Sequence, residues 1–217
     1  MRPDIKDEKL STMFESKFLN VYEYPFKENG HYYTASRRKR KDLVMFKSEE
    51  EYQNMLPDAV TCAVIVTGKA GEPRILMNYE FRYAAGEFIL APPAGLIDEE
   101  DKQSDTPEII TAIREIHEET GLTVKDTDKV FVVSPWLFSS PGMTDEGNAI
   151  VCAVIDLDDP SQMNHDGSLG SEVFDGFELL TKEQAKEIIK TGRDKHNHFY
   201  SIYTWVCLMV FISDMWK

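Results

Sequence analysis

The chain has 217 residues, of which 42% are hydrophobic and 29% charged, and its formal net charge is -14. It is long enough to bury a core of its own. The acidic balance argues against nucleic acid or an anionic membrane as the main partner, because both would present phosphates to a repelling surface. Residues Met1 to Asp7 lack an apolar targeting core, and the apolar stretch Phe199 to Ile212 is shorter than a membrane span and indicates a core helix.

Three cysteines, Cys62, Cys152 and Cys207, each lie inside an apolar run. Neither their number nor their spacing suggests a disulfide framework or a metal site. We therefore expect small buried side chains in a reducing compartment, which predicts a cytoplasmic protein.

The N-terminal part predicts a strand-rich opening. Strands are expected at Phe18 to Tyr24, His31 to Ala35 and Leu43 to Phe46, with a hairpin turn at Glu28-Asn29-Gly30. The basic run Arg37 to Lys41 is either a solvated face or a source of electrostatic steering for phosphates.

The rest of the chain mixes strands with three helices, which indicates a layered α/β domain. The expected strands are Thr61 to Val66, Arg74 to Phe81, Phe88 to Leu90, Val130 to Pro135 and Asn148 to Asp156. The expected helices are Thr106 to Thr120, Thr181 to Thr191 and Asn197 to Met215.

The first of these helices has clear end signals. Thr106-Pro107-Glu108 reads as an N-cap, a proline at the first helical position and an early acidic residue, and Gly121 supplies a left-handed C-cap.

Three carboxylates gather on one face of this helix. Glu118 and Glu119 lie about 60° and 40° to either side of Glu115, while Ile113 and Ile116 form a neighbouring apolar stripe. Like charges at these spacings repel, so the cluster needs a compensating cation, and a hard divalent metal such as Mg²⁺ prefers oxygen ligands. The alternative is a solvated acidic face.

The stretch Arg114-Glu115-Ile116-His117-Glu118-Glu119-Thr120-Gly121-Leu122, with Gly95 upstream, resembles the signature of the Nudix hydrolases, G-x5-E-x7-R-E-U-x-E-E-x-G-U, with U a bulky aliphatic residue. The pattern separates its first glycine and its arginine by fourteen positions, but here the separation is nineteen, which indicates a five-residue insertion around Glu100 to Asp105. Thr106 stands where the pattern has a glutamate that steadies the arginine, and Asp105 or Glu108 is expected to take over that task.

Two further segments resemble one branch of the family, the ADP-ribose and ADP-sugar pyrophosphatases. Glu80-Phe81-Arg82 followed by Ala91 to Asp98 is similar to that branch's Gln-aromatic-Arg strand and P-A-G-L-I-D turn, with Glu80 in place of the glutamine. Ser140-Pro141-Gly142 is similar to its S-P-G loop.

The resemblance implies a Nudix-type α/β/α sandwich with a mixed sheet, with residues 1–57 as a strand-rich dimerisation segment and residues 58–217 as the hydrolase domain. It implies metal-dependent hydrolysis of the diphosphate bond of a nucleoside diphosphate sugar, ADP-ribose first, giving AMP and ribose 5-phosphate. Mg²⁺, or Mn²⁺, is expected on Glu115, Glu118 and Glu119 with the backbone carbonyl of Ala94. The expected partners are the small-molecule substrate and a second copy of the chain, without nucleic acid or membrane.

The resemblance also implies roles for further residues. Arg82 is expected to contact the diphosphate, Arg114 to orient the site, and Tyr33, Gly142 and Glu146 to bind substrate. Tyr32 and Trp136 are further candidates for stacking on adenine.

The resemblance also implies that the general base comes from a mobile loop. The matching loop is the glycine-containing segment Asn164 to Glu172, with Glu172 ahead of Glu146 as the base. His117 is expected to point away from the carboxylates.

Other functions remain open at this point. The substrate is alternatively ADP-glucose, GDP-mannose or another nucleoside diphosphate derivative, and the protein is alternatively a non-catalytic Nudix-fold binding module. Isoprenoid diphosphate isomerisation would require a cysteine in the pocket, whereas the cysteines all lie in apolar runs.

Overall fold

The computed structural model describes residues 5–27, 29–68, 71–168, 170 and 172–217. The chain forms two compact units: unit 1 comprises Met1–Asp58 and Trp136–Asn148, and unit 2 comprises Ala59–Pro135 and Ala149–Lys217. Glu28 of the expected hairpin turn, Met1 to Asp4, and Leu169 and Ser171 of the expected loop lie outside the described residues.

Unit 1 contains a three-stranded sheet of β1 (Ser11–Glu15), β2 (Asn20–Phe26) and β3 (Gly30–Ser36), together with the short helix α1 (Glu49–Gln53). Both strand pairs are antiparallel, and Phe26 stands opposite Gly30, which confirms the expected hairpin between β2 and β3. A small core forms around the buried side chains of Leu10, Tyr22 and Leu43.

The prediction of a strand at Leu43 to Phe46 was wrong. Val44–Phe46 is a 3-10 helix instead. The backbone N–H of Val44 donates to a carboxylate oxygen of Asp145 at 3.1 Å rather than to a neighbouring strand, and Leu43 turns into the core. Propensity alone favoured a strand here, and these two tertiary contacts override it.

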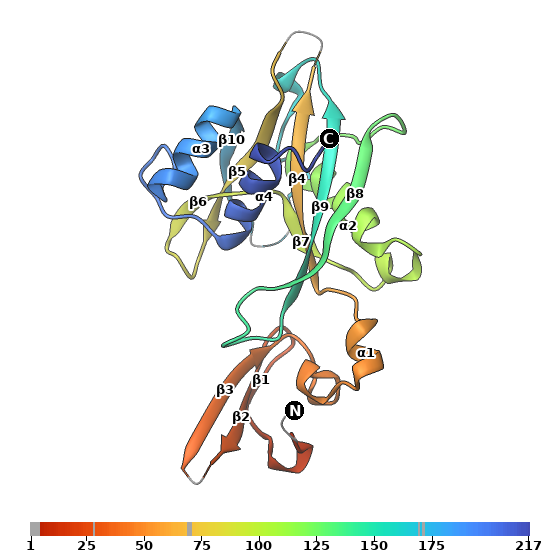
Figure 1. The fold of residues 1–217 in the computed structure, drawn as a ribbon, viewed down its shortest axis with the longest axis vertical. Helices are drawn as coiled ribbons and strands as arrows, with labels where there is room; N and C mark the ends of the chain where they lie inside the picture. The colour runs from red at the N-terminus through yellow and green to blue at the C-terminus, as the bar shows by residue number, and fades with distance from the viewer. Residues whose placement is uncertain (1–4, 28, 69–70, 169, 171) are drawn as a thin grey trace. The chain divides into compact units, whose positions relative to one another are not determined.

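Unit 2 is built on a second sheet with the strand order β10-β5-β4-β9-β8, in which β6 also pairs with β5 and β7 with β4 (Figure 1). The strands are β4 (Ala59–Thr67), β5 (Arg74–Arg82), β6 (Glu87–Ala91), β7 (Ala94–Leu96), β8 (Lys129–Phe138), β9 (Gly147–Asp156) and β10 (Phe174–Leu180). The helices are α2 (Pro107–Thr120), α3 (Lys182–Thr191) and α4 (Ile202–Ile212). The C-terminal end of β8, from Trp136, and the N-terminal end of β9, up to Asn148, belong to unit 1.

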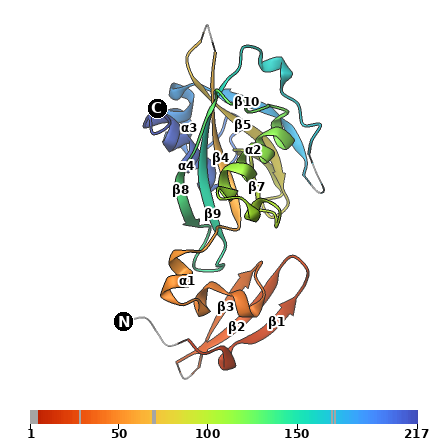
Figure 2. The same ribbon diagram turned by 90° about the vertical axis from the view of Figure 1, so that its right-hand side faces the viewer.

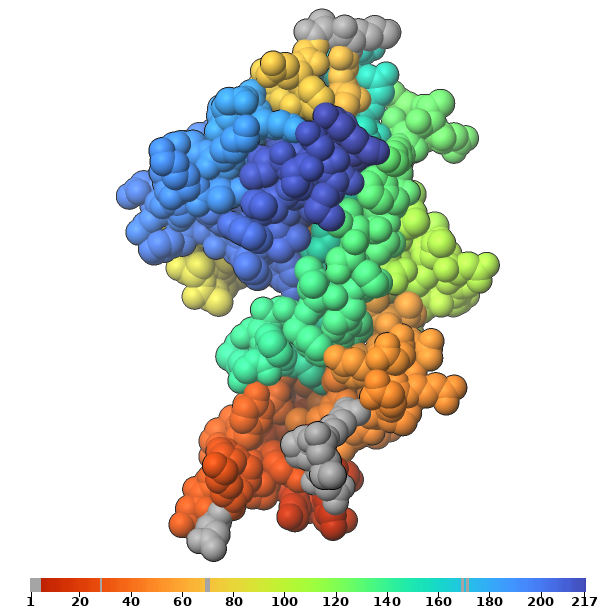
Figure 3. Space-filling view, viewed as in Figure 1, coloured from red at the N-terminus to blue at the C-terminus, as the bar shows by residue number. Residues whose placement is uncertain are grey.

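The helices form a layer on each face of this sheet. Figure 2 shows α2 on one side of the central strand β4 and α4 on the other, with α3 beside α4. In the space-filling view, the side chains of α3 and α4 form a continuous layer over their face (Figure 3). This α/β/α sandwich with a mixed sheet is the expected fold.

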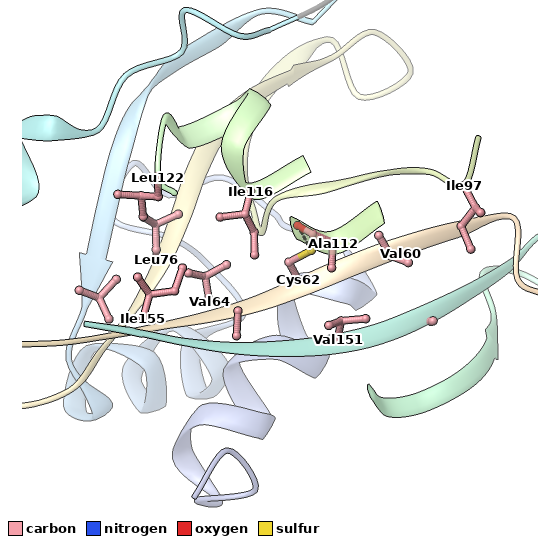
Figure 4. Close-up of a cluster of buried hydrophobic side chains, with 13 residues drawn as sticks. Val60, Cys62, Val64, Leu76, Ile97, Ala112, Ile116, Leu122, Val151 and Ile155 are labelled. Carbon is pink, nitrogen blue, oxygen red and sulfur yellow. Dashed lines mark hydrogen bonds between the residues drawn. The ribbon is translucent and has the colours of Figure 1, made fainter. Parts of the chain in front are cut away.

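The main hydrophobic core lies between α2 and the sheet (Figure 4). Alternate residues of β4, including Val60, Cys62 and Val64, face Ala112 and Ile116 of the helix, and all five side chains are fully buried. Because side chains alternate along a strand, the intervening residues Thr61, Ala63 and Ile65 lie on the face toward α4 and are buried as well, which explains the nearly continuous apolar run in the sequence.

Several further elements differ from the expectation. The strands β1, β7 and β10 and the helix α1 were not predicted, and α4 begins at Ile202, capped by Ser201, rather than at Asn197. The three cysteines are buried and free, as expected. No helix among the described residues is long and apolar enough to cross a membrane.

Candidate active site

Helix α2 carries the carboxylate motif, and its ends lie where the sequence indicates. Pro107 occupies the first turn after Thr106, and Gly121 adopts a φ of 70°, in the left-handed region. Its Ala112 and Ile116 face the core, which fixes the rotation of the helix and turns Glu115 and Glu119 toward β5 and β7.

Glu119 is buried at the centre of the site. One carboxylate oxygen accepts from the Ala94 backbone N–H at 3.1 Å, and the other accepts from the Asn78 side-chain amide at 2.6 Å. Burial raises the pKa of Glu119 well above its ordinary value, although the Ala94 hydrogen bond opposes this effect. Neighbouring carboxylates raise it further: Glu80, Glu115 and Glu172. These two hydrogen bonds connect α2 to β5 and β7, but neither donor carries a positive charge.

Glu115 lies against the backbone of Gly95. A Cβ atom at Gly95 would stand 1.9 Å from Glu115 Oε1, so only glycine leaves room for this carboxylate. Burial raises the pKa of Glu115 to about 7, against the opposing charge of Arg114. The charges of Glu118 and Glu172 also raise it.

Arg114 links the carboxylates to the loop before the helix. Its Nη1 donates to Glu115 at 2.7 Å and to Glu118 at 3.1 Å, while its Nη2 donates to the Leu96 carbonyl at 2.9 Å and to Asp101 at 3.0 Å. Arg114 therefore holds the loop and the motif together, which is consistent with an orienting part.

The acidic residue that steadies Arg114 is Asp101, and the expectation of Asp105 or Glu108 was wrong. Asp101 is only 7% exposed and also accepts from the Thr111 hydroxyl at 2.9 Å. Burial raises the pKa of Asp101, but hydrogen bonds from Arg114 and Thr111 outweigh it and leave the pKa below its ordinary value. The inserted loop folds back so that a residue inside it, rather than one at its end, reaches the arginine.

A divalent cation fits the donors of this site. Carboxylate oxygens are the ligands that Mg²⁺ prefers, and Arg114 Nη1 already lies as a positive group between Glu115 and Glu118. Across the part of the chain that the structure describes, no three His, Cys, Asp or Glu side chains stand in a ready metal-binding arrangement.

Strand β5 supplies the opposite wall. Because side chains alternate along a strand, Asn78, Glu80 and Arg82 share the face that meets Glu119. Glu80 is 8% exposed and pairs with Arg82 at 2.6 Å, and the Arg82 side chain is half exposed. Glu80 thus holds Arg82, the arginine expected to bind the diphosphate.

Glu172 joins the same group of charges. Its side chain is exposed, and its charge acts on Glu80, Glu115 and Glu119, raising the pKa of each. The structure therefore brings this loop carboxylate together with the motif. His117 is exposed on the other side of α2, as expected.

The remaining expected site residues belong to unit 1. Glu146 accepts from Arg37 at 2.9 Å and from the Ser139 hydroxyl at 2.8 Å. A Cβ atom at Gly142 would have nothing within 4 Å, and Tyr33 is 55% exposed.

The two other aromatic candidates also lie in unit 1. The Tyr32 hydroxyl donates to the Pro141 carbonyl at 3.3 Å, and Trp136 packs over Gly147. Substrate contacts of all these residues stay predictions.

Sequence reasoning missed three residues that shape the site: Asn78, Asp101 and His165. Asn78 carried a usable signal, because a polar residue inside an apolar strand requires a partner. Asp101 had none, since it is one of several acidic residues in a polar loop. His165, whose ring nitrogen contacts the Glu119 carbonyl at 2.6 Å, was part of the loop expected to move.

The chain is similar to several known proteins. An uncharacterized Nudix hydrolase of Schizosaccharomyces pombe is 32% identical over 134 residues, covering 60% of each protein. The ADP-ribose pyrophosphatase of Bacillus subtilis is 29% identical over 129 residues, which is 59% of this chain and 63% of that protein. The chain thus spans less than two thirds of the length of these relatives. Among solved structures, an Ap4A hydrolase binary complex of Caenorhabditis elegans has a TM-score of 0.45 and 17% identity, covering 72% of this chain and 97% of that chain.

A family model described as the NUDIX domain matches residues 55–201, which include β4, β5, β7, α2 and the loop that carries Glu172. The chain belongs to the Nudix family.

Proposed function

We propose that this protein hydrolyses the diphosphate bond of a nucleoside diphosphate sugar, with ADP-ribose as the substrate and AMP and ribose 5-phosphate as the products. The observation that carries the proposal is the convergence of Glu80, Glu115, Glu119 and Glu172 from three separate parts of unit 2. The pKa values of Glu80, Glu115 and Glu119 are raised, and a group of carboxylates with raised pKa values is a typical feature of a functional site. The Bacillus subtilis relative named an ADP-ribose pyrophosphatase supports the choice of substrate.

Members of the family use divalent metal ions, and we propose Mg²⁺, or Mn²⁺, for this chain. Glu115, Glu118 and Glu119 would hold it, with the Ala94 carbonyl as a further ligand. A bound divalent ion lowers the pKa of water and neutralises developing phosphate charge. The local charge supports this choice, because the two arginines Arg82 and Arg114 balance only part of the charge of the surrounding carboxylates.

The chain's own residues then have distinct parts. Water forms a new bond to one phosphorus while the bond from that phosphorus to the bridging oxygen breaks, and Glu172 accepts the proton that the water loses. Arg82, released from Glu80, binds the diphosphate. Asn78 and the Ala94 N–H keep Glu119 in place, and Arg114 orients the motif. We further propose that Tyr33, Gly142 and Glu146 contribute to substrate binding.

A substrate panel tests the proposal directly. Purified protein with Mg²⁺ is incubated with ADP-ribose, ADP-glucose and GDP-mannose, and the products are separated by chromatography. We expect AMP and ribose 5-phosphate from ADP-ribose at the highest kcat/KM. Preference for another sugar would replace the substrate but keep the chemistry.

Two variants separate catalysis from binding. Glu119→Gln should lower kcat by about 100-fold or more, since it removes a charge at the reacting centre, while Glu187→Gln on the exposed face of α3 should leave it unchanged. Calorimetric binding of ADP-ribose without turnover of any compound would instead indicate a non-catalytic binding module.

We also propose a homodimer formed through residues 1–57. Unit 1 exposes a set of large apolar side chains on and beside its sheet: Met13, Phe14, Phe18, Leu19, Phe26, Tyr32 and Tyr33. Apolar side chains gathered in this way are typical of an interface. Sedimentation velocity should give a dimer at micromolar concentration and a monomer for Phe14→Glu; a monomeric parent protein would contradict the proposal.

A further inference from the structure

His165 connects the start of the loop before β10 to the last turn of α2. Its Nδ1 lies 2.6 Å from the Glu119 carbonyl oxygen, and since a carbonyl only accepts, Nδ1 carries the hydrogen. The adjacent Asn164 N–H donates to the Thr120 carbonyl at 3.0 Å. The last carbonyls of a helix have no partner within it. These two residues therefore satisfy carbonyls at the end of the motif helix, including that of the buried glutamate itself.

The ring of His165 is held by β10. It stacks on Phe174 with ring centroids 4.6 Å apart and an interplanar angle of 6°, and on Phe177 at 4.0 Å and 21°. Its Nε2 is buried and has no hydrogen-bond partner in the described part of the chain. Within the described residues, the ring's one polar contact is that of Nδ1 with the Glu119 carbonyl, and its stacking contacts are aromatic.

The neighbouring backbone follows α2 closely. A Cβ atom at Gly167 would lie 2.7 Å from the Glu118 carbonyl oxygen, so this glycine packs directly on the helix. The Ser168 N–H donates to the His165 carbonyl at 3.1 Å and the Ser168 hydroxyl does so at 2.6 Å. His165 therefore begins a compact turn that ends at Ser168, four residues before Glu172.

The segment on the other side of Glu172 is also fixed. The Phe81 N–H donates to the Val173 carbonyl at 2.8 Å, and Phe174 stands opposite Glu80 in the β10–β5 register. Glu172 thus lies between an attachment to β5 and the turn that His165 attaches to α2.

We propose that His165 is a positioning residue: its hydrogen bond to the Glu119 carbonyl sets the distance between the loop carboxylate Glu172 and the carboxylates of α2. The inference rests on the proposed function, in which Glu172 accepts the proton from water. The bond joins the backbone of one participating residue to the loop of the other, so its loss changes their separation without removing either carboxylate.

Two substitutions separate the effect of the hydrogen bond from Nδ1 from the effect of the ring's stacking. His165→Phe keeps an aromatic ring between Phe174 and Phe177 and removes the donor, whereas His165→Asn places an amide N–H where Nδ1 was and removes the stacking. His117→Phe is the matched control, since His117 Nδ1 also contacts a backbone carbonyl, that of Leu122 at 3.4 Å, on the exposed side of the same helix.

For His165→Phe we expect kcat to fall about 10- to 100-fold with KM within about twofold of the parent value, because displacement of a reacting group by about 1 Å has this effect. His165→Asn should recover part of kcat although it melts at a lower temperature. His117→Phe should match the parent protein. Parent-like kcat in His165→Phe, or a lower kcat in His165→Asn than in His165→Phe, would overturn the proposal.

Amide hydrogen exchange gives a readout that does not depend on turnover. The Asn164 and Ser168 amides should exchange faster in His165→Phe than in the parent, and unchanged exchange would refute the attachment. If the parent protein turned over no substrate, the proposed function would fail while this measurement still decided the part of His165. If His165→Phe did not fold, His165→Asn alone would decide: kcat within about tenfold of the parent supports the proposal, and a larger loss contradicts it.

Discussion

At the scale of single residues, the fold buries carboxylates that would be more stable in water. Glu115 and Glu119 are 5% and 3% exposed, and both have raised pKa values because of burial. A buried charge without full compensation costs stability, so the metal-free site is expected to be strained electrostatically. A cation that bound to these carboxylates in the folded state would restore this lost stability.

The pH dependence of stability should report this cost. The pKa of Glu115 in the folded protein, about 7, lies above its ordinary value of 4.5. The folded state therefore binds more protons than the unfolded chain, and the contribution to stability is lost as pH rises through about 7. With a chelator present, urea denaturation should show Glu115→Gln to be more stable than the parent by roughly 1–2 kcal/mol at pH 8 and nearly equal at pH 4.5.

Glu183→Gln is the control for this comparison, because Glu183 is largely exposed on α3. Its stability should follow the parent at both pH values. A stability difference between Glu115→Gln and the parent that stays constant from pH 4.5 to 8 without metal would rule out a raised pKa at Glu115.

Asp101 has the opposite electrostatic character. Because Arg114 and Thr111 hold its pKa low, its contribution to stability is lost as pH falls through that lowered value. Asp101→Asn should lower the free energy of unfolding at pH 7 by about 1–3 kcal/mol, since it breaks a buried charged hydrogen bond. Thermal and urea unfolding measure this effect.

The comparison for Asp101→Asn is Glu99→Gln in the same loop. Glu99 pairs with Lys102 but is 88% exposed, and exposed pairs contribute about 0–1 kcal/mol. Equal effects of the two substitutions would show that Asp101 does not anchor the loop.

At the scale of elements, strand β7 is short, but its glycine decides whether α2 can approach the sheet. Gly95→Ala would place a methyl group on the Glu115 carboxylate. We expect Mg²⁺ affinity, measured by calorimetry, to fall at least about tenfold, and stability to fall by about 1–3 kcal/mol from overpacking.

Gly71→Ala serves as the control for Gly95→Ala, because nothing lies within 4 Å of a Cβ at that position. It should leave both quantities unchanged. Parent-like Mg²⁺ affinity in Gly95→Ala would mean that Glu115 binds metal in another position.

The elements that the sequence predicted are those with strong local signals. Helix α2 has a proline start, a glycine end and one apolar face, and strands β4 and β9 are long apolar runs, so their patterns survive in the structure. Strand β10 was missed because Asp175 and Gly176 interrupt its alternation, and its register with β5 indeed shifts between Phe174 and Phe177. Local patterns predict an element well only where its pairing is regular.

Among the residues of the candidate site, too, only those with a strong local pattern could be predicted from the sequence. Glu115, Glu118 and Glu119 were predictable from helical spacing, because one helix carries all three. The partner of Arg114 was not, since Asp101 reaches it through the fold of an inserted loop. His165 was also out of reach, because its contact with Glu119 joins residues 46 positions apart.

At the scale of the whole molecule, the net charge of -14 would oppose the approach of the anionic substrate that we propose. Screening this repulsion should raise kcat/KM by about two- to threefold when NaCl increases from about 20 to 200 mM, with free Mg²⁺ kept saturating. Initial rates at low substrate concentration measure the effect. A steady fall in kcat/KM with salt would instead show that local attraction by Arg82 and the metal dominates.

The path of the chain between its two units constrains how the protein can be shortened. The backbone leaves unit 1 after Asp58, re-enters it at Trp136 and leaves again after Asn148. The returning segment is bonded to the N-terminal sheet, as in the Ala35 N–H to Met143 carbonyl bond of 2.8 Å, and Arg38 lies over the ring of Trp136. A truncated protein starting at Ala59 would retain Trp136 and Phe138 without the strands that shelter them, and its expected fate on expression is aggregation, so removal of the N-terminal sheet requires these two aromatic residues to be replaced as well.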